Sequence, residues 1–356
     1  MSDTITIQSH KGPYTVEFGR GPLTDSTSYA SGGVHLLVDA TVARLYAAPL
    51  QELLAKPTTV TIEAHEDSKS LEGMIPLFEK VVRNGVRRDH TLVAIGGGIV
   101  QDATCFIAST LLRGVPWQFV PTTLLAQADS CIGSKSSINL GGRKNLLGTF
   151  NPPRRVFVDP AFLDTLDVKE IRSGIGEIAK VHAIAGRDTF DGFARDFDAL
   201  FTDRAVLARH TRAALEIKQR YIEADEFDVG IRNIFNYGHS FGHAIESATH
   251  YAVPHGIAVA MGMDAANALS VARGLTPAVH YERMHGVLAS LYAAFAGTAI
   301  NVSDVLAALM SDKKNTSSAL GLILPIGPDA EIQRLLIERD ETLMAQLGTV
   351  VGALFR

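Results

Sequence analysis

The chain has 356 residues, of which 46% are hydrophobic and 20% are charged, and its formal net charge is −5. This composition is too apolar for a disordered chain, and the negative charge disfavours a nucleic acid as the main partner. No stretch approaches the roughly 20 apolar residues of a membrane span, and residues 1–4 do not resemble a signal peptide. Two cysteines, Cys105 and Cys131, cannot make a disulfide framework, so we expect a reducing, cytoplasmic environment.

The first 160 residues alternate short apolar strands with helical stretches. Such alternation is typical of a parallel, doubly wound sheet. The sequence therefore predicts an α/β domain in residues 1–160. The expected strands are 34–38, 58–62, 91–95, 117–120 and 155–158, with helices between them that include 70–83 and 102–112.

After Pro160 the pattern becomes helical, and strand signals nearly vanish until 320–324. We therefore expect a second, all-helical domain in residues 161–356. Its apolar residues recur at helical spacing in 169–185, 203–224, 239–250, 258–272 and 280–296.

A glycine turn, Gly96-Gly97-Gly98, follows the expected strand 91–95 and precedes Asp102 and a helix. Glycine allows backbone N–H groups to approach an anion, and the helix N-terminus adds partial positive charge. The pattern fits a nucleotide phosphate, but a plain strand-to-helix turn needs the same glycines.

Three further residues near the expected strands each allow two interpretations, one functional and one structural. Asp39 ends the strand 34–38, where a carboxylate can bind a ribose or cap the next helix. Glu66 and Lys69 can grip ribose hydroxyls or form a surface ion pair. The residues alone leave both alternatives open.

A metal site is indicated by histidines and a glutamate. His239 and His243 are four residues apart on an expected helix and so share a face, and His255 follows twelve residues later. Glu177 lies on an earlier helix, one turn before Lys180. A catalytic zinc site uses three protein ligands and one open position, so there are more candidates than ligands.

Basic residues recur beside glycine and asparagine in an otherwise acidic chain. Such turns are typical of an anion site, although solvated surface charge explains any single one. They are Arg113, Lys135, Arg143, Lys144, Lys218, Arg232, Lys313 and Lys314.

Several ordered segments together resemble the sugar-phosphate cyclases, the superfamily that includes the 3-dehydroquinate synthases. They are PTTLLAQADS at 121–130, GSKSSIN at 133–139, KNLLG at 144–148, GEIAK at 176–180 and the block containing His239, His243 and His255. The resemblance runs from about Asp39 to about Lys314.

The resemblance implies a Rossmann-like domain that binds NAD, a helical domain that binds a divalent metal, and an active site in the cleft. The metal would be zinc, with cobalt as the second option, and the protein would be a homodimer. By position, Glu177, His239 and His255 would be the metal ligands, and His243 would lie beside the metal or the phosphate.

The resemblance also implies roles for the remaining candidates. Arg113 would be donated across the dimer to the neighbouring site. NAD would be held by Asp39, Glu66, Lys69, Gly96, Gly97, Gly98, Asp102, Thr122, Thr123, Asp129 and Lys144. Catalytic residues would be Lys135, Lys180, Lys218, Arg232, Asn236 and His243, and substrate would also contact Asp129, Asn145, Lys313 and Lys314.

The reaction implied by the resemblance converts a heptulosonate 7-phosphate to 3-dehydroquinate. It combines transient oxidation by NAD, phosphate elimination, return of the hydride and an intramolecular aldol closure, so it is redox-neutral. The chain departs from the usual 3-dehydroquinate synthase pattern at Cys105, at Ser134, Ser136 and Ser137, and at Phe235.

These departures leave the substrate open. One alternative is a specialised cyclase that acts on sedoheptulose 7-phosphate, or a related sugar phosphate, to give a cyclitol. The other is a metal-dependent polyol dehydrogenase, which shares the two-domain plan but needs no phosphate pocket.

Overall fold

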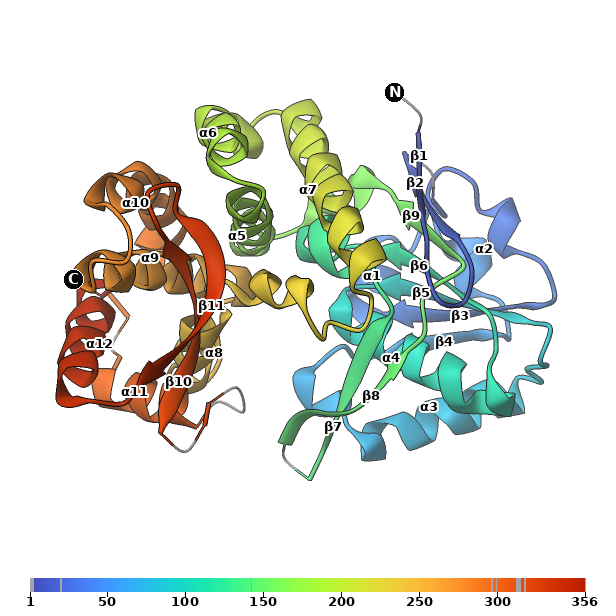
Figure 1. Ribbon diagram of the computed structural model, residues 1–356. Coiled ribbons are helices and arrows are strands. Elements are labelled where there is room, and N and C mark those ends of the chain that lie inside the picture. Colours follow the sequence, from blue (N-terminus) through green and yellow to red (C-terminus); the bar gives the residue numbers. More distant parts are fainter. Residues whose placement is uncertain are drawn as a thin grey trace. The chain divides into compact units, whose positions relative to one another are not determined.

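The computed structural model describes residues 3–19, 21–141, 143–295, 297–298, 300–311, 315–316 and 318–355 (Figure 1). The chain forms two compact units. The first comprises Met1–Leu166 and Lys218–Asp228, and the second comprises Asp167–Ile217 and Val229–Arg356. The expected boundary at residue 160 lies near the first break. The return of 218–228 to the first unit has no signal in the sequence, because the helical pattern of 203–224 continues through it.

The first unit is built on a sheet in which the described residues form seven strands, in the order β1-β2-β9-β6-β5-β3-β4. All neighbours pair in parallel except β1 and β2, which form an antiparallel edge. The predicted doubly wound parallel sheet is confirmed. The strands are β1 (Thr4–Ile7), β2 (Tyr14–Phe18), β3 (Val34–Asp39), β4 (Thr59–Ile62), β5 (Thr91–Gly96), β6 (Trp117–Pro121) and β9 (Arg155–Val158).

The strand order reverses between β3 and β5, which lie side by side although β4 comes between them in the chain. In open α/β sheets ligands bind beyond the carboxyl ends of the strands at such a switch point. Asp39 ends β3 and Gly96 ends β5, so both predicted nucleotide-binding positions lie at this edge.

Helices and a second hairpin complete the first unit. Leu92–Ile95 of β5 is buried, as expected for a strand covered on both faces. The helices are α1 (Ala40–Leu45), α2 (Gln51–Leu54), α3 (Leu71–Arg83) and α4 (Gly98–Thr110), and β7 (Lys135–Leu140) pairs antiparallel with β8 (Arg143–Phe150). Short turns of helix are η1 (Thr27–Tyr29), η2 (Glu66–Ser68), η3 (Leu111–Arg113), η4 (Ala126–Ser130) and η5 (Pro160–Thr165).

The second unit is helical, as predicted, with one addition. The strand signal at 320–324 belongs to an antiparallel hairpin of β10 (Ala319–Ile326) and β11 (Glu331–Glu338), so this unit is not all-helical. β11 was not expected because most of its side chains are exposed or half-buried and show no clear alternation. Among the described residues no helix is both long and apolar enough to cross a membrane.

The helix α9 (His255–Ala272) is buried along most of its length. The other helices of the second unit are α5 (Val168–Ile184), α6 (Arg187–Arg195), α8 (His239–Ala248), α10 (Ala278–Tyr292), α11 (Val302–Met310) and α12 (Glu341–Ala353). The helix α7 (Arg204–Ala224) contributes residues to both units, and the short turns are η6 (Asp198–Phe201), η7 (Ile231–Asn236) and η8 (Ala293–Phe295).

Candidate functional site

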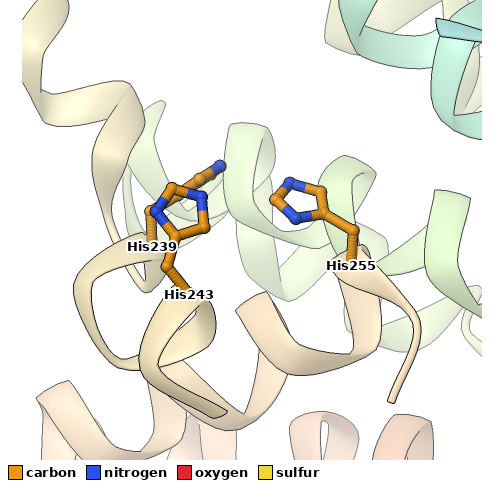
Figure 2. Close-up of side chains that lie close together, drawn as sticks. All are labelled: His239, His243 and His255. Atoms are coloured by element: carbon orange, nitrogen blue, oxygen red, sulfur yellow. The ribbon is translucent and has the colours of Figure 1, made fainter. Parts of the chain in front are cut away.

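Three histidines of the second unit converge. His239 begins α8, His243 follows one turn later, and His255 begins α9 (Figure 2). One nitrogen from each ring lies within 4.8 Å of the others. Imidazole nitrogens at this separation can share one divalent cation after small side-chain adjustments.

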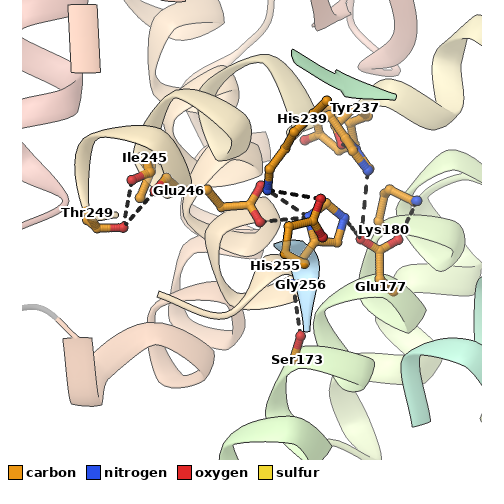
Figure 3. A network of polar contacts seen from close by, with 12 residues as sticks. Ser173, Glu177, Lys180, Tyr237, His239, Ile245, Glu246, Thr249, His255 and Gly256 are labelled. Carbon is orange, nitrogen blue, oxygen red and sulfur yellow. Dashed lines mark hydrogen bonds and ion pairs between the residues drawn. The ribbon is translucent and has the colours of Figure 1, made fainter. Parts of the chain in front are cut away.

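Glu177 of α5 adds a carboxylate to this cluster (Figure 3). Its side chain is 1% exposed, and its Oε1 lies 3.4 Å from His255 Nε2 and 3.9 Å from His239 Nε2. Oε2 accepts a hydrogen bond of 2.5 Å from Lys180, whereas buried Oε1 has no hydrogen-bond partner among the residues described. A buried carboxylate oxygen is costly to leave unpaired. Facing two imidazole nitrogens, it fits a divalent metal such as zinc.

Hydrogen bonds at Nδ1 orient the rings of His239 and His255. His239 Nδ1 lies 3.3 Å from the Tyr237 carbonyl, and His255 Nδ1 lies 3.2 Å from each oxygen of Glu246. Carbonyl and carboxylate oxygens only accept, so each Nδ1 carries the proton. Each Nε2 then keeps its lone pair on the side of Glu177, as a metal ligand requires.

Burial by itself lowers the pKa of His255, but the hydrogen bond to Glu246 and the negative charge of Glu177 outweigh it and raise the pKa. Two carboxylates therefore concentrate negative charge around this ring. Glu246 is not among the site residues expected from the sequence, although it lies three residues after His243 on the same helix.

A glycine contact brings Glu177 and His255 together. A Cβ added at Gly256 would lie 1.8 Å from the Ser173 carbonyl oxygen, and one at Gly176 would lie 2.1 Å from the Gly256 carbonyl oxygen. Gly256 N also donates to Ser173 Oγ at 2.9 Å. Only glycine allows α5 and α9 to approach this closely, one residue from each of the two candidate ligands.

Other predicted residues of the second unit lie near these in the chain. Lys180 is 2% exposed and lies with its Nζ 5.8 Å from the centre of the Phe235 ring. Arg232, which is buried, and Asn236, which donates to the Asn233 carbonyl at 3.0 Å, belong to η7, just before α8. The choice of three ligands among Glu177 and the three histidines stays a prediction.

In the first unit, the structure brings together residues predicted to bind NAD at the ends of β3, β5 and β6. A Cβ at Gly96 would lie 3.2 Å from Asp39 Cβ, and one at Gly97 would lie 3.1 Å from Thr123 Cγ2. Thr122 N donates to the Gly96 carbonyl. Gly98 begins α4, so backbone N–H groups of a 13-residue helix start at this edge.

Asp39 caps α1, because its Oδ1 accepts from the backbone nitrogens of Thr41 and Val42 at 2.7 and 3.3 Å. The capping alternative is therefore confirmed. A role toward a ribose stays a prediction.

The proposed surface pair between Glu66 and Lys69 is wrong. Lys69 Nζ lies 2.6 Å from Asp102 Oδ2 and donates to Asn145 Oδ1 at 3.0 Å. Glu66 instead pairs with Lys144 at 3.4 Å. Burial raises the pKa of Asp102, and the Lys69 charge offsets part of this rise. The buried Lys69 thus links two chain segments that the sequence left unconnected.

Asp129 lies in η4, a π-helical turn separated by two residues from Thr122 and Thr123, which follow β6. Such turns are frequent at functional sites. Lys218 Nζ lies 2.6 Å from the Asp129 carbonyl and 3.0 Å from its Oδ1. Lys135 forms an ion pair with Asp228.

Three predicted residues are not placed with these groups. Arg113 ends the exposed turn η3 with a positive φ of 65°. Lys313 and Lys314 lie outside the described residues.

Comparison with known proteins decides the family. The N-terminal model of 3-dehydroquinate synthase matches residues 59–173, and the C-terminal model matches residues 174–315. The chain belongs to the 3-dehydroquinate synthase family. The resemblance found in the sequence is confirmed.

The relatives cover most of the chain. A 3-dehydroquinate synthase from Thermoanaerobacter sp. (strain X514) is 34% identical over 96% of this chain and 99% of its own length. One from Xylella fastidiosa (strain 9a5c) is 37% identical over 88% of this chain and 84% of its own length. Among solved structures, a 2-epi-5-epi-valiolone synthase from Streptomyces hygroscopicus subsp. jinggangensis 5008, with NAD+ and Zn2+ bound, has a TM-score of 0.81. It is 26% identical and covers 96% of both chains.

Proposed function

We propose that the protein is an NAD- and metal-dependent sugar-phosphate cyclase that converts a heptulosonate 7-phosphate to 3-dehydroquinate with loss of phosphate. Membership in the 3-dehydroquinate synthase family supports the reaction class. The observation that carries the metal requirement is the buried Glu177 Oε1, which has no hydrogen-bond partner among the described residues and is faced by two oriented histidine nitrogens.

When bound, NAD supplies a reversible hydride acceptor, and the metal polarises an oxygen of the substrate. Glu177, His239 and His255 would hold the metal, and the edge formed by Asp39, Gly96 and Gly97 would hold NAD. Lys180 is fixed by Glu177, so its ammonium keeps one position. Such fixed charge favours a developing negative charge without reorganisation.

The substrate carries a carboxylate and a phosphate, and basic side chains suit both. The guanidinium fork of Arg232 would bind the carboxylate at two points, and Lys135 and Lys218 would add positive charge. Sedoheptulose 7-phosphate lacks the carboxylate. We therefore take the heptulosonate as the substrate and the specialised cyclase as the alternative outcome.

We further propose a homodimer that acts in the cytoplasm. Both cysteines are free and buried, which agrees with a reducing compartment. Arg113, at an exposed turn, would reach a neighbouring copy. Sedimentation of the purified protein would test the dimer.

One experiment tests the activity. The purified protein is incubated with NAD, zinc or cobalt, and either the heptulosonate 7-phosphate or sedoheptulose 7-phosphate, and phosphate, NADH and product mass are followed. We expect phosphate release from the heptulosonate without accumulation of NADH. Release from sedoheptulose 7-phosphate alone would indicate the specialised cyclase, and stoichiometric NADH would indicate the polyol dehydrogenase.

A further inference from the structure

We propose that Glu246 is a positioning residue that selects the tautomer and fixes the ring of His255 for metal binding. The inference rests on the metal site of the proposed function. It assigns a role to a side chain that is not itself a candidate ligand.

The contacts of His255 place it between two carboxylates. Its Nδ1 lies 3.2 Å from both oxygens of Glu246, and its Nε2 lies 3.4 Å from Glu177 Oε1 (Figure 3). The Glu246 side chain is only 13% exposed, so this bond is largely protected from water. The orientation of the imidazole is therefore fixed from both sides, and the lone pair of Nε2 points toward Glu177, the other candidate metal ligand.

His255 needs this support more than a histidine inside a helix would. It is the first residue of α9, and its side chain is 34% exposed. A neutral imidazole exists in two tautomers, and only the one with a proton on Nδ1 leaves Nε2 free to ligate. A carboxylate behind Nδ1 accepts that proton's hydrogen bond and also makes Nε2 more basic.

The two oriented histidines differ in what orients them. His239 donates to the Tyr237 backbone carbonyl, which a side-chain substitution does not remove. His255 depends on the Glu246 side chain, so the same effect can be changed by mutation. A substitution of Glu246 therefore removes the group that orients His255 but leaves His255 itself in place as a metal ligand.

The test uses metal-stripped full-length protein, with zinc titrated against a chromophoric chelator and cobalt followed by its visible absorption. We expect Glu246→Ala to weaken metal affinity about 10- to 100-fold and to change the cobalt spectrum. Glu246→Gln should recover part of the affinity, because an amide oxygen still accepts from Nδ1. Glu216→Ala is the matched control, since Glu216 is exposed on α7 and pairs with Arg212.

A purely structural role predicts another result. The melting temperature of the metal-free Glu246→Ala variant would fall, while zinc affinity and cobalt spectrum stayed those of the parent, and this would overturn the proposal. A crystal structure with a Glu246 oxygen on the metal would also overturn it. If the parent bound neither metal, the metal site of the proposed function would fail as well, so the two failures are distinguishable.

Discussion

His239 and His243 lie on the same face of α8, yet their surroundings differ. His239 is half-buried, and its Nε2 lies 3.9 Å from Glu177 Oε1, whereas His243 is exposed. We expect His239→Ala to lose at least about 100-fold in zinc affinity, since a lost ligand costs more than a lost orienting group. His243→Ala should retain zinc. Metal content after dialysis checks this, and equal loss in both variants would contradict the assigned ligand set.

Arg232 is buried in η7 and is predicted to bind the substrate carboxylate. Lysine keeps the charge but lacks the planar fork. Each lost charge-assisted hydrogen bond is worth roughly 1.5–3 kcal/mol. Arg232→Lys should therefore lower kcat/KM with the heptulosonate by about one to two powers of ten per bond.

The same variant needs a control for folding, because a buried arginine can also be structural. Asp228, an acidic residue four positions before Arg232 in the chain, pairs with Lys135. The melting temperature of Arg232→Lys should stay near that of the parent. Efficient turnover of sedoheptulose 7-phosphate by the parent, with none of the heptulosonate, would refute the carboxylate role.

At the level of elements, the closest approach of α5 to α9 is the feature most sensitive to a single methyl group. The added Cβ of Gly256→Ala would meet the Ser173 carbonyl at 1.8 Å, so the helices must separate. We expect the free energy of unfolding to fall by at least the roughly 1–3 kcal/mol typical of overpacking. Zinc binding should weaken as well, because His255 moves with α9. Thermal unfolding and metal content are the measurements.

Gly286 provides the matched control for this change. It lies in α10, and an added Cβ there would have nothing within 4 Å. Gly286→Ala should leave zinc binding unchanged and add about 0.5–1 kcal/mol of stability, because alanine favours the helix. If Gly256→Ala behaved like Gly286→Ala, the tight contact would not be what places His255.

The elements that the sequence predicted are those whose burial gives a clear pattern. The strand 91–95 is apolar and buried after Thr91 because both its faces are covered, and it corresponds to β5. The strand β11 was not predicted, because its residues are mostly exposed or half-buried and show no clear alternation. Within the site, the histidine spacing predicted the metal cluster. The contact between Glu246 and His255 could not be predicted, because it depends on how α8 packs against α9 and not on a local sequence pattern.

At the scale of the whole molecule, the least predictable feature is the helix α7, whose last residues join the first unit. Lys218 reaches Asp129, 89 positions earlier in the chain. An amphipathic pattern predicts a helix but does not say which sheet or bundle its two ends contact. The family resemblance named both residues as site residues, but neither the resemblance nor the helical pattern predicted that they pair.

We expect His280 of α10 to destabilise the fold in acid. The side chain is buried, its Nε2 lies 3.3 Å from Asn267 Oδ1, and Arg283 donates to its Nδ1 at 3.2 Å. An arginine can only donate, so Nδ1 must stay unprotonated. Burial, followed by the charges of Arg283 and Arg187, lowers the pKa of His280 from 6.5 to about 4.

The sign of the effect on stability follows from this lowering. Between pH 6.5 and 4 the unfolded chain binds a proton at this position and the folded protein does not, so stability falls as the pH falls through this window. His280→Gln keeps a donor for Asn267 and an acceptor for Arg283 but cannot titrate. Its free energy of unfolding should therefore fall less steeply toward acid pH, by up to about 1.4 kcal/mol per pH unit.

Urea unfolding at pH 7, 5.5 and 4.5 would measure the two slopes, with His250→Gln at an exposed position as the matched control. Parallel curves for the parent and His280→Gln would show that His280 takes up no proton on unfolding, and this would contradict the prediction.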